Sequence, residues 1–554
     1  MNRLRSNPWI TLLVLNMGFF MILLDTTIVN IAIPSIIDAL GASLDDILWV
    51  LNAYILVYAV LLITSGRLGD IVGQRTMFAA GMAVFVVASA FSGQAHSTTQ
   101  LIAARMAQGV GGAMLTPQTL AMITSIFPSE RRGAAFGVWG AVAGVAAVTG
   151  PTLGGFIVTN LDWRWIFYIN LPIGVLSLAA TFVFVPDLRP GRRHRLDIVG
   201  VLLASAGLFL IVFGLIEGEI YNWGVVFSFV SIPMIIAAGV LLVAAFAFWE
   251  TRQAEPLVPL SLFKNRNYSV MNGVALVLAF AMLGLYLPLT IYLQSVLGFS
   301  ALEAGLALAP MSLTSMIVAP FSGRLADRIG GKYILMLGLA LYATGMGIIA
   351  WTATTGTPWS AFLAPLVIAG FGQGCVFAPM NTVAMRDITP RMAGAASGVI
   401  NTTRQLGGVI GSSVVGALLQ NQLVVHLREQ AIAYSSQLPA QFRDQFVQGF
   451  SNAVNTGFEV GPGQNGGVPL PPGVPPQVVE QLGRIAHDVF ASGFVDAMRP
   501  TLVVPLVVVL LGALSCLAVI NDRRVLQEMP VEERRPAEPY AAGRPAPREG
   551  RSLP

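Results

Sequence analysis

An aspartate stands inside the first apolar run of the chain. The run extends from Trp9 to Pro34 and carries no other charge, which makes it longer than the ~20 residues that cross a bilayer. A carboxylate at that depth costs roughly 2.5–3.5 kcal/mol on insertion scales, so it normally faces a bundle interior or a water-filled cavity. Asp25 is therefore a candidate for binding and releasing a proton. A plain hydrogen bond to a neighbouring helix is the alternative.

A turn rich in glycine and arginine occurs twice. The segment 66–75 (GRLGDIVGQR) recurs as 323–332 (GRLADRIGGK), and the short segments at 116 and 133 recur at 378 and 394. This near-constant offset predicts a duplicated unit of six spans, as in alternating-access carriers. The glycines permit close backbone approach, and an aspartate can pair with an arginine or cap a helix N-terminus. The turns are candidates for a latch between the two halves, or for well-capped tight turns. The candidate latch residues are Gly66, Arg67, Asp70, Gly73, Arg75, Gly323 and Asp327.

Arg105 lies among small residues in the fourth apolar run. A permanently charged guanidinium there needs an acid, a carbonyl or water beside it, unless its long side chain reaches the surface. The corresponding place in the second half, near Gly370, has no charge. This asymmetry predicts that proton handling is concentrated in the first half.

The fifth apolar run carries a stripe of glycines at positions 133, 137, 140 and 144, which share one helical face. Such a stripe permits close contact between helices. It is followed by Gly150, Pro151, Gly154 and Gly155. Proline removes a backbone hydrogen bond and can kink a helix, so this motif is a candidate for packing and for a hinge.

The composition is that of a polytopic membrane protein. Of 554 residues, 55% are hydrophobic and 11% charged, whereas soluble domains have about 25% charged residues. The net charge of +4 gives little support for nucleic-acid binding. Cys375 and Cys516 lie in apolar runs, so a disulfide framework is not expected. No phosphate-binding Gly-x-x-x-x-Gly-Lys-Ser/Thr loop occurs, and the four histidines lack metal-ligand spacing. An enzyme and an ATP-driven pump are therefore disfavoured, and the duplicated six-helix halves argue against a receptor. No cofactor and no metal are expected.

We predict an all-α protein with fourteen transmembrane helices. The expected spans are 10–33, 45–64, 76–95, 100–123, 134–158, 165–185, 198–216, 226–248, 268–293, 302–321, 333–352, 359–380, 396–420 and 501–520. Arginines gather in the loops on one side, which the positive-inside rule assigns to the cytoplasm together with both termini. The expected parts are a six-helix bundle (1–190), two inserted helices (191–264), five helices of a second bundle (265–420), an outer segment (421–499), the last helix (500–522) and a disordered tail (523–554).

The outer segment 421–499 has helical apolar spacing in 422–454 and 477–498, joined by a Gly/Pro-rich link. Two amphipathic helices at the outer surface are expected. They form either a solvated spacer or a site for a lid or partner.

In these motifs the chain resembles the major facilitator superfamily, and within it the fourteen-helix drug:proton antiporters of the EmrB/QacA type. The resemblance rests on LDTTIVN at 24–30, the turn at 66–75 and its repeat, Arg105 with Gln108 and Gly109, the Gly-Pro motif at 150–155, and WRWIFYINLP at 163–172. It implies two six-helix halves with two inserted helices and export of hydrophobic, often cationic compounds in exchange for protons. Asp25 would be the coupling acid, Arg105 would tune it, and Asp70 would belong to the latch. Ala146 and the long outer segment depart from the family pattern.

The leading function is thus proton-driven multidrug efflux from a bacterial cytoplasmic membrane by a monomer embedded in lipid. The alternative is a dedicated exporter of one endogenous metabolite, lipid or self-made antibiotic. Six polar and aromatic side chains are candidates for lining a substrate pocket, and each is also an ordinary packing residue. They are Asn30, Trp49, Tyr54, Tyr58, Asn401 and Gln405.

Overall fold

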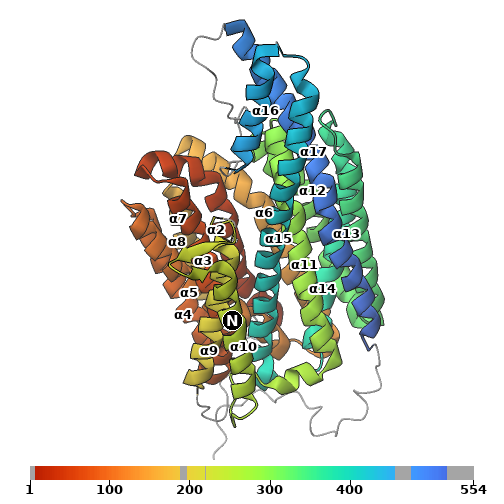
Figure 1. Cartoon of the computed structure of the whole chain (residues 1–554). Coiled ribbons are helices and arrows are strands. Elements are labelled where there is room, and N and C mark those ends of the chain that lie inside the picture. The colour runs from red at the N-terminus through yellow and green to blue at the C-terminus, as the bar shows by residue number, and fades with distance from the viewer. Residues whose placement is uncertain (1–6, 188–195, 219, 439, 456–475, 521–554) are drawn as a thin grey trace, which may run out of the picture. The chain divides into compact units, whose positions relative to one another are not determined.

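The computed structural model describes residues 7–187, 196–218, 220–438, 440–455 and 476–520, and these are almost entirely helical (Figure 1). The helices are α2 (Pro8–Leu40), α3 (Leu44–Val72), α4 (Gln74–Gly93), α5 (Thr98–Ile126), α6 (Arg132–Asn160), α7 (Trp165–Tyr168), α8 (Asn170–Phe184), α9 (Ile198–Glu217), α10 (Ile232–Glu250), α11 (Arg266–Ile291), α12 (Ala301–Ile329), α13 (Lys332–Thr352), α14 (Leu363–Met385), α15 (Ala393–Ser435), α16 (Ala440–Asn455) and α17 (Pro476–Ser515). A short antiparallel hairpin, β1 (Val225–Phe227) and β2 (Val230–Ser231), precedes α10.

Thirteen helices of the described residues are long and apolar enough to cross a membrane, one fewer than the fourteen spans expected. The expected span that is missing from this set is 100–123. It is helical, as α5, but it contains Gln100, Arg105, Gln108 and Gln118. Three of these four side chains are buried in the bundle, where other protein groups replace water as their partners. The fourteenth long helix is therefore present, and only its apolarity is low.

The two halves repeat the same local chemistry at the starts of α3 and α12. Ser43 and Asp46 form a capping box before α3, and Ser300 with Glu303 forms one before α12. In each box the serine hydroxyl accepts the backbone N–H three residues on, and the acid accepts the serine N–H, which satisfies two exposed donors. The two serines are 257 positions apart (300 minus 43), the same offset as the repeated turns. The duplication thus extends to the helix caps.

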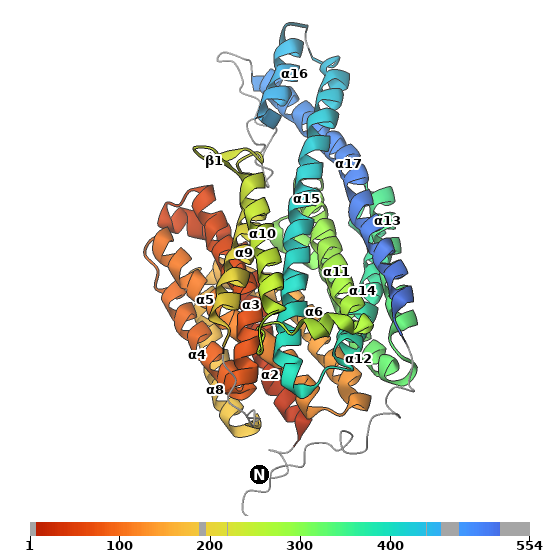
Figure 2. The same cartoon turned by 60° about the horizontal axis from the view of Figure 1, so that its bottom comes forward.

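The inserted helices α9 and α10 pack on each other, and α9 also contacts both halves. Phe213 of α9 lies 6.0 Å from Trp49 of α3, measured between ring centroids. The Ser413 hydroxyl of α15 donates to the Leu215 carbonyl of α9 at 2.8 Å. Figure 2 shows α9 and α10 running alongside α3 and α15. The insertion therefore lies along one of the two contacts between the halves.

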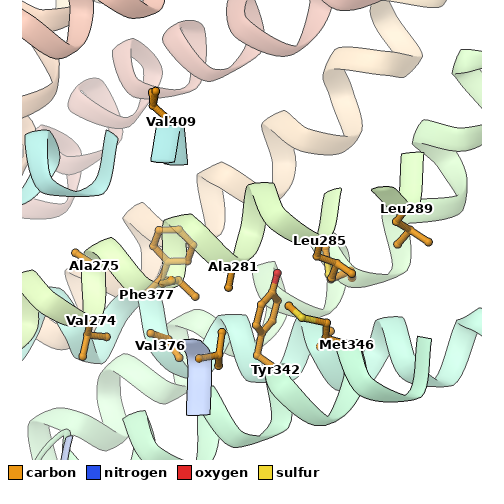
Figure 3. Packing of buried hydrophobic residues seen from close by; sticks show 14 of the residues in the cluster. Val274, Ala275, Ala281, Leu285, Leu289, Tyr342, Met346, Val376, Phe377 and Val409 are labelled. Atoms are coloured by element: carbon orange, nitrogen blue, oxygen red, sulfur yellow. The ribbon is translucent and has the colours of Figure 1, made fainter. Parts of the chain in front are cut away.

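The interior of the second half is filled by apolar side chains from α11, α13 and α14 (Figure 3). Tyr342, Leu285 and Val376 are among the fully buried members of this cluster. Because lipid is as apolar as these side chains, helix association within a membrane depends on close packing more than on the hydrophobic effect. The tight contacts at glycines likewise hold the helices together by close packing.

The glycine stripe of α6 packs against α12 of the other half. A Cβ atom added at Gly137 would lie 2.6 Å from the Ala319 carbonyl oxygen and from the Pro320 Cα, which are both backbone atoms. At Gly140 the nearest atoms would be 3.6 Å and 3.7 Å away, in ordinary contact. The two glycines therefore lie on the same helix but differ in the room available for a side chain.

This difference predicts unequal effects of one methyl group. Gly137→Ala should destabilise the protein by about 1–3 kcal/mol, because backbone atoms must move apart. Gly140→Ala is the matched control, since it adds the same methyl to the same helix. We expect the thermal unfolding midpoint in detergent to fall for the first variant alone. Equal midpoints would contradict the close packing of α6 on α12.

The helices of the segment 421–499 differ from those expected. Residues up to Ser435 continue α15 without a break, and residues from Pro476 onward form the start of α17, so neither stretch is a separate surface helix. No proline interrupts 393–435, which lets the span and the amphipathic stretch form one helix. Among the described residues of this segment, α16 alone forms a separate helix. It packs on α15, and its Phe446 and Phe450 side chains are buried. Figure 1 shows α16 beyond one end of the bundle. The Gly/Pro-rich link and the tail 523–554 lie outside the described residues.

Candidate functional site

Asp25 lies fully buried in α2 and accepts hydrogen bonds from three side chains of two other helices, α5 and α8. Its Oδ2 accepts the Arg105 guanidinium of α5 in a direct ion pair. Its Oδ1 accepts the side-chain amides of Gln108 of α5 and Asn170 of α8, each at 3.0 Å. Hydrogen bonds to charged groups are about twice as strong as neutral ones. The carboxylate is thus held by one cation and two neutral donors.

Arg105 is only 1% exposed, so it does not reach the surface. Besides Asp25, it donates through Nη1 to Gln108 Oε1 at 2.8 Å and through Nε to the Val50 carbonyl oxygen at 3.3 Å. The ring of Tyr54 lies against the guanidinium, 4.4 Å from its Cζ, in a cation–π contact. An acid, a carbonyl and an aromatic face therefore replace the water that a guanidinium would otherwise need.

Further buried polar groups extend this network. Asn170 also donates to the Ser89 hydroxyl of α4 at 3.1 Å, and Ser89 in turn donates to the Phe167 carbonyl at 2.9 Å. Ser92 donates to Gln108 Oε1 at 3.3 Å. Gln108, Asn170 and Ser89 were not among the predicted site residues. The available signal was their polar type within apolar spans, whereas Asp25 and Arg105 were marked by their charge.

The two repeated turns contact the opposite half in the same way. Asp70, at the end of α3, accepts the backbone N–H groups of Gly394 and Ala395 at the start of α15, both at 2.9 Å. Asp327, at the end of α12, accepts those of Gly133 and Ala134 at the start of α6, at 2.8 Å and 3.0 Å. Each acid satisfies N–H groups that lack partners within the helix and meets the positive end of its dipole.

The glycines of these turns allow the halves to approach through their backbones. A side chain at Gly66 would collide with the Gly394 backbone, and one at Gly323 would collide with that of Gly133. Gly73, which follows α3, has φ +106°, a conformation that favours glycine. All these contacts lie at the arginine-rich end of the bundle. That end is closed in this structure.

The two arginines of the first turn act in different places. Arg67 is buried and lies near Asp70 within the turn. Arg75 instead binds Asp187, which follows α8, at 3.0 Å, and the Val185 carbonyl at 3.4 Å. Arg75 therefore ties two helices within one half and is not brought to the contact between the halves.

The Gly-Pro motif of α6 lies between two helices. Gly150 packs on Thr27 and Gly154 on Ile28 of α2, while Gly155 faces Leu302 of α12. Pro151 contacts Gly305 of α12 and lies inside a helix that continues from Arg132 to Asn160. Any hinge at Pro151 therefore operates within a continuous helix.

The family model described as Major Facilitator Superfamily matches residues 15–197 and 190–412. The chain belongs to the major facilitator superfamily. This confirms the family and the fold predicted from the sequence.

Two relatives of this facilitator carry names that refer to resistance. It is 35% identical to the tetracenomycin C resistance and export protein of Streptomyces glaucescens, over 76% of this chain and 77% of that protein. It is 34% identical to multidrug resistance protein Stp of Mycobacterium tuberculosis (strain CDC 1551 / Oshkosh), over 74% and 75% of the two chains. The fold is similar to that of the proton:xylose symporter XylE, with a TM-score of 0.53 at 16% identity over 76% of this chain and 90% of that one. The protein is a multi-pass bacterial membrane transporter of small molecules and not an enzyme.

The structure brings only part of the predicted pocket of this facilitator together. Tyr54 and Tyr58 stack at 5.9 Å between ring centroids, and the Tyr58 hydroxyl donates to Thr116 at 3.0 Å. Asn401 is buried in α15, whereas Trp49 lies against α9. The two remaining pocket candidates are less buried. Asn30 is exposed and donates to Thr26 of its own helix, and Gln405 is half-buried.

Proposed function

We propose that this facilitator exports amphipathic small molecules, drugs or antibiotics among them, from the cytoplasm in exchange for protons. The observation that carries the proposal is the buried Asp25–Arg105 pair, which is a titratable group held within a transmembrane bundle. Intramembrane ionisable residues of this kind mark proton and substrate pathways. The name of the Streptomyces glaucescens relative refers to export, which supports export as the direction of transport.

Alternating access would link the two sites. A proton that enters from outside neutralises Asp25 and weakens its hold on Arg105. The latch formed by Asp70 and Asp327 then opens, and the halves rock apart at the arginine-rich end, which the positive-inside pattern assigns to the cytoplasm along with both termini. Substrate binds from that side, and the proton leaves. On this proposal the proton gradient supplies the energy for transport, and no cofactor is needed. A monomer embedded in lipid carries out the whole cycle. The same proposal includes a partner that docks on the outer segment 421–499.

The energy of the gradient is sufficient for export. One elementary charge that moves through 100 mV releases about 2.3 kcal/mol, and each pH unit adds about 1.4 kcal/mol. One proton that moves through 100 mV and one pH unit therefore releases about 3.7 kcal/mol, which supports a concentration ratio of roughly 400-fold for a neutral substrate, since 1.4 kcal/mol corresponds to a factor of ten.

Efflux from cells tests the proposal. Bacteria that lack their own major pumps are loaded with ethidium, a lipophilic cation, or with fluorescein, an aromatic anion. Expression of the chain should speed efflux of at least one dye several-fold, and a protonophore should abolish the difference. Export that persists after the gradient has collapsed would contradict proton coupling.

A dedicated exporter of one self-made compound is the second candidate, and the relative named for tetracenomycin C export favours it. In that case neither dye would leave faster, while a compound made by the source organism would. Comparing culture supernatants of the source organism with and without the gene distinguishes the two candidates.

A further inference from the structure

A second arginine lies inside the bundle, on α15. Arg404 is eleven residues from the start of α15 at Ala393, which places it about 16 Å into the helix at 1.5 Å per residue. That depth is close to the middle of a hydrocarbon core about 30 Å thick. Its repeat counterpart in α6, at the offset of 261 that relates Gly394 to Gly133, is Ala143. The arginine is therefore a feature of the second half alone.

Unlike Arg105, Arg404 has no acidic partner among the described residues. It donates to the Asn401 side-chain oxygen at 2.9 Å and interacts with Tyr58 of α3, which are both neutral groups. The acids of α3 lie near its two ends, and α6 has none. Asp25 is already occupied by Arg105, Gln108 and Asn170. Within the described residues, the guanidinium of Arg404 therefore has no carboxylate beside it.

The same place offers an unused donor and aromatic surfaces. Trp139 of α6 is 1% exposed, and its indole N–H has no hydrogen-bond partner within the described part of the chain. Its ring lies 5.7 Å from the Arg404 Cζ and stacks on Phe19 of α2, with ring centroids 4.4 Å apart. Buried donors normally find partners. A cation and a free N–H beside stacked aromatic rings match a flat aromatic molecule that carries an anionic oxygen.

We propose that Arg404 binds the carboxylate or ionised phenol of an aromatic substrate, with Trp139 and Tyr58 beside the ring. This deepens the proposed function, on which it rests, by naming the substrate class. Intramembrane cations are retained where they have a functional partner, and a guanidinium recognises carboxylate oxygens in a planar, two-point geometry. The site lies where helices of both halves meet, since Tyr58 and Trp139 belong to the first half and Arg404 to the second.

The stacked tyrosines join this site to the proton site. Tyr54 lies against Arg105, Tyr58 interacts with Arg404, and the two rings are nearly parallel at an interplanar angle of 8°. A bound anion would therefore be connected to the Asp25–Arg105 pair by a continuous chain of side-chain contacts.

Three matched probes test the charge preference on the purified full-length protein in detergent. They are 2-naphthoate, 2-naphthamide and 2-naphthylmethylammonium, which share one aromatic core and differ in charge. Isothermal titration without a proton gradient should show 2-naphthoate binding at least tenfold more tightly than the other two. Equal affinities, or a preference for the ammonium, would overturn the proposal without any variant.

Variants then locate the preference. Arg404→Gln should remove the advantage of 2-naphthoate, and Arg404→Lys should keep part of it. Arg428→Gln is the matched control, because it removes the same charge from an exposed position on the same helix. Retention of the full preference in a folded Arg404→Gln protein would overturn the assignment. Thermal unfolding reports whether each variant is folded.

These outcomes are separable from those of the proposed function. Anion preference that depends on Arg404 without proton-driven efflux would support the binding site and reject the export mechanism. Proton-driven efflux of ethidium by a protein that shows no anion preference would support the export mechanism and reject the binding site.

Discussion

Asp25→Asn is expected to abolish proton-driven export while the protein still reaches the membrane. Asparagine has the size of aspartate and accepts hydrogen bonds from Gln108 and Asn170, but it does not exchange a proton. It also leaves Arg105 buried without its counter-charge, and breaking a buried pair from one side costs about 3–5 kcal/mol. The effect is measured as the uptake of ethidium or fluorescein into inverted vesicles, driven by an imposed pH gradient. Uptake should fall to the level of vesicles without the protein.

A second variant separates coupling from stability. In Asp25→Asn with Arg105→Gln the uncompensated charge is gone, so the unfolding midpoint should recover toward that of the native protein while proton-driven uptake stays absent. Asp25→Glu keeps a carboxyl and should retain partial uptake. Proton-driven uptake at the native rate in Asp25→Asn would remove this residue from the coupling role and leave the ion pair as a structural contact.

The sequence marked Asp25 and Arg105 but did not show that they are in contact. Asp25 and Arg105 stood out because a charge in an apolar span is rare, yet they lie 80 positions apart and nothing in the sequence shows that α2 and α5 meet there. Arg404 carried the same signal within the predicted span 396–420 and was missed, although its neighbours Asn401 and Gln405 were named. Charge within a span thus marked the two residues that the structure joins in a buried ion pair.

Helical geometry explains why the structure brings only some of the predicted pocket residues together. Tyr54 and Tyr58 are four residues apart and share a face, at 100° per residue, whereas Trp49 lies five residues before Tyr54 and points about 140° away. The structure accordingly stacks the tyrosines and places Trp49 against Phe213 of α9. The inserted helix that contacts Trp49 could not be placed from the sequence, because periodicity does not show which helix a face meets.

The repeated turn was more informative, because duplication relates contacts as well as residues. Both turns and both Gly-Ala segments, at 133 and 394, were recognised as repeats. Each turn pairs with the Gly-Ala segment of the opposite half because the two halves are related by symmetry. The sequence offsets indicate this symmetry but do not show which segments meet. The structure adds the hydrogen-bond donors of each acid, which are the backbone N–H groups at the start of a helix in the opposite half.

That pairing predicts the second large effect. Each acid accepts two backbone N–H groups of the other half, and hydrogen bonds to charged groups contribute about 1.5–3 kcal/mol each. Asp70→Ala should therefore disfavour the closed arginine-rich end by about 3–6 kcal/mol, and about 5.5 kcal/mol turns a 99:1 population into 1:99. Asp327→Ala should have a smaller effect, because Asp327 is half-buried whereas Asp70 is 8% exposed.

Spin-label distances across that end measure the opening. Labels at Thr76→Cys and Arg391→Cys report on opposite halves from exposed positions, after the buried cysteines are removed by Cys375→Ala and Cys516→Ala. Asp187→Ala is the control, since it removes a carboxylate whose ion pair with Arg75 lies within one half. We expect a longer distance in Asp70→Ala, a longer one still when Asp327→Ala is added, and no change in the control. Because the two acids lie on different contacts, their effects should add. A distance that stays short in the double variant would show that the glycine backbone contacts alone hold the halves together.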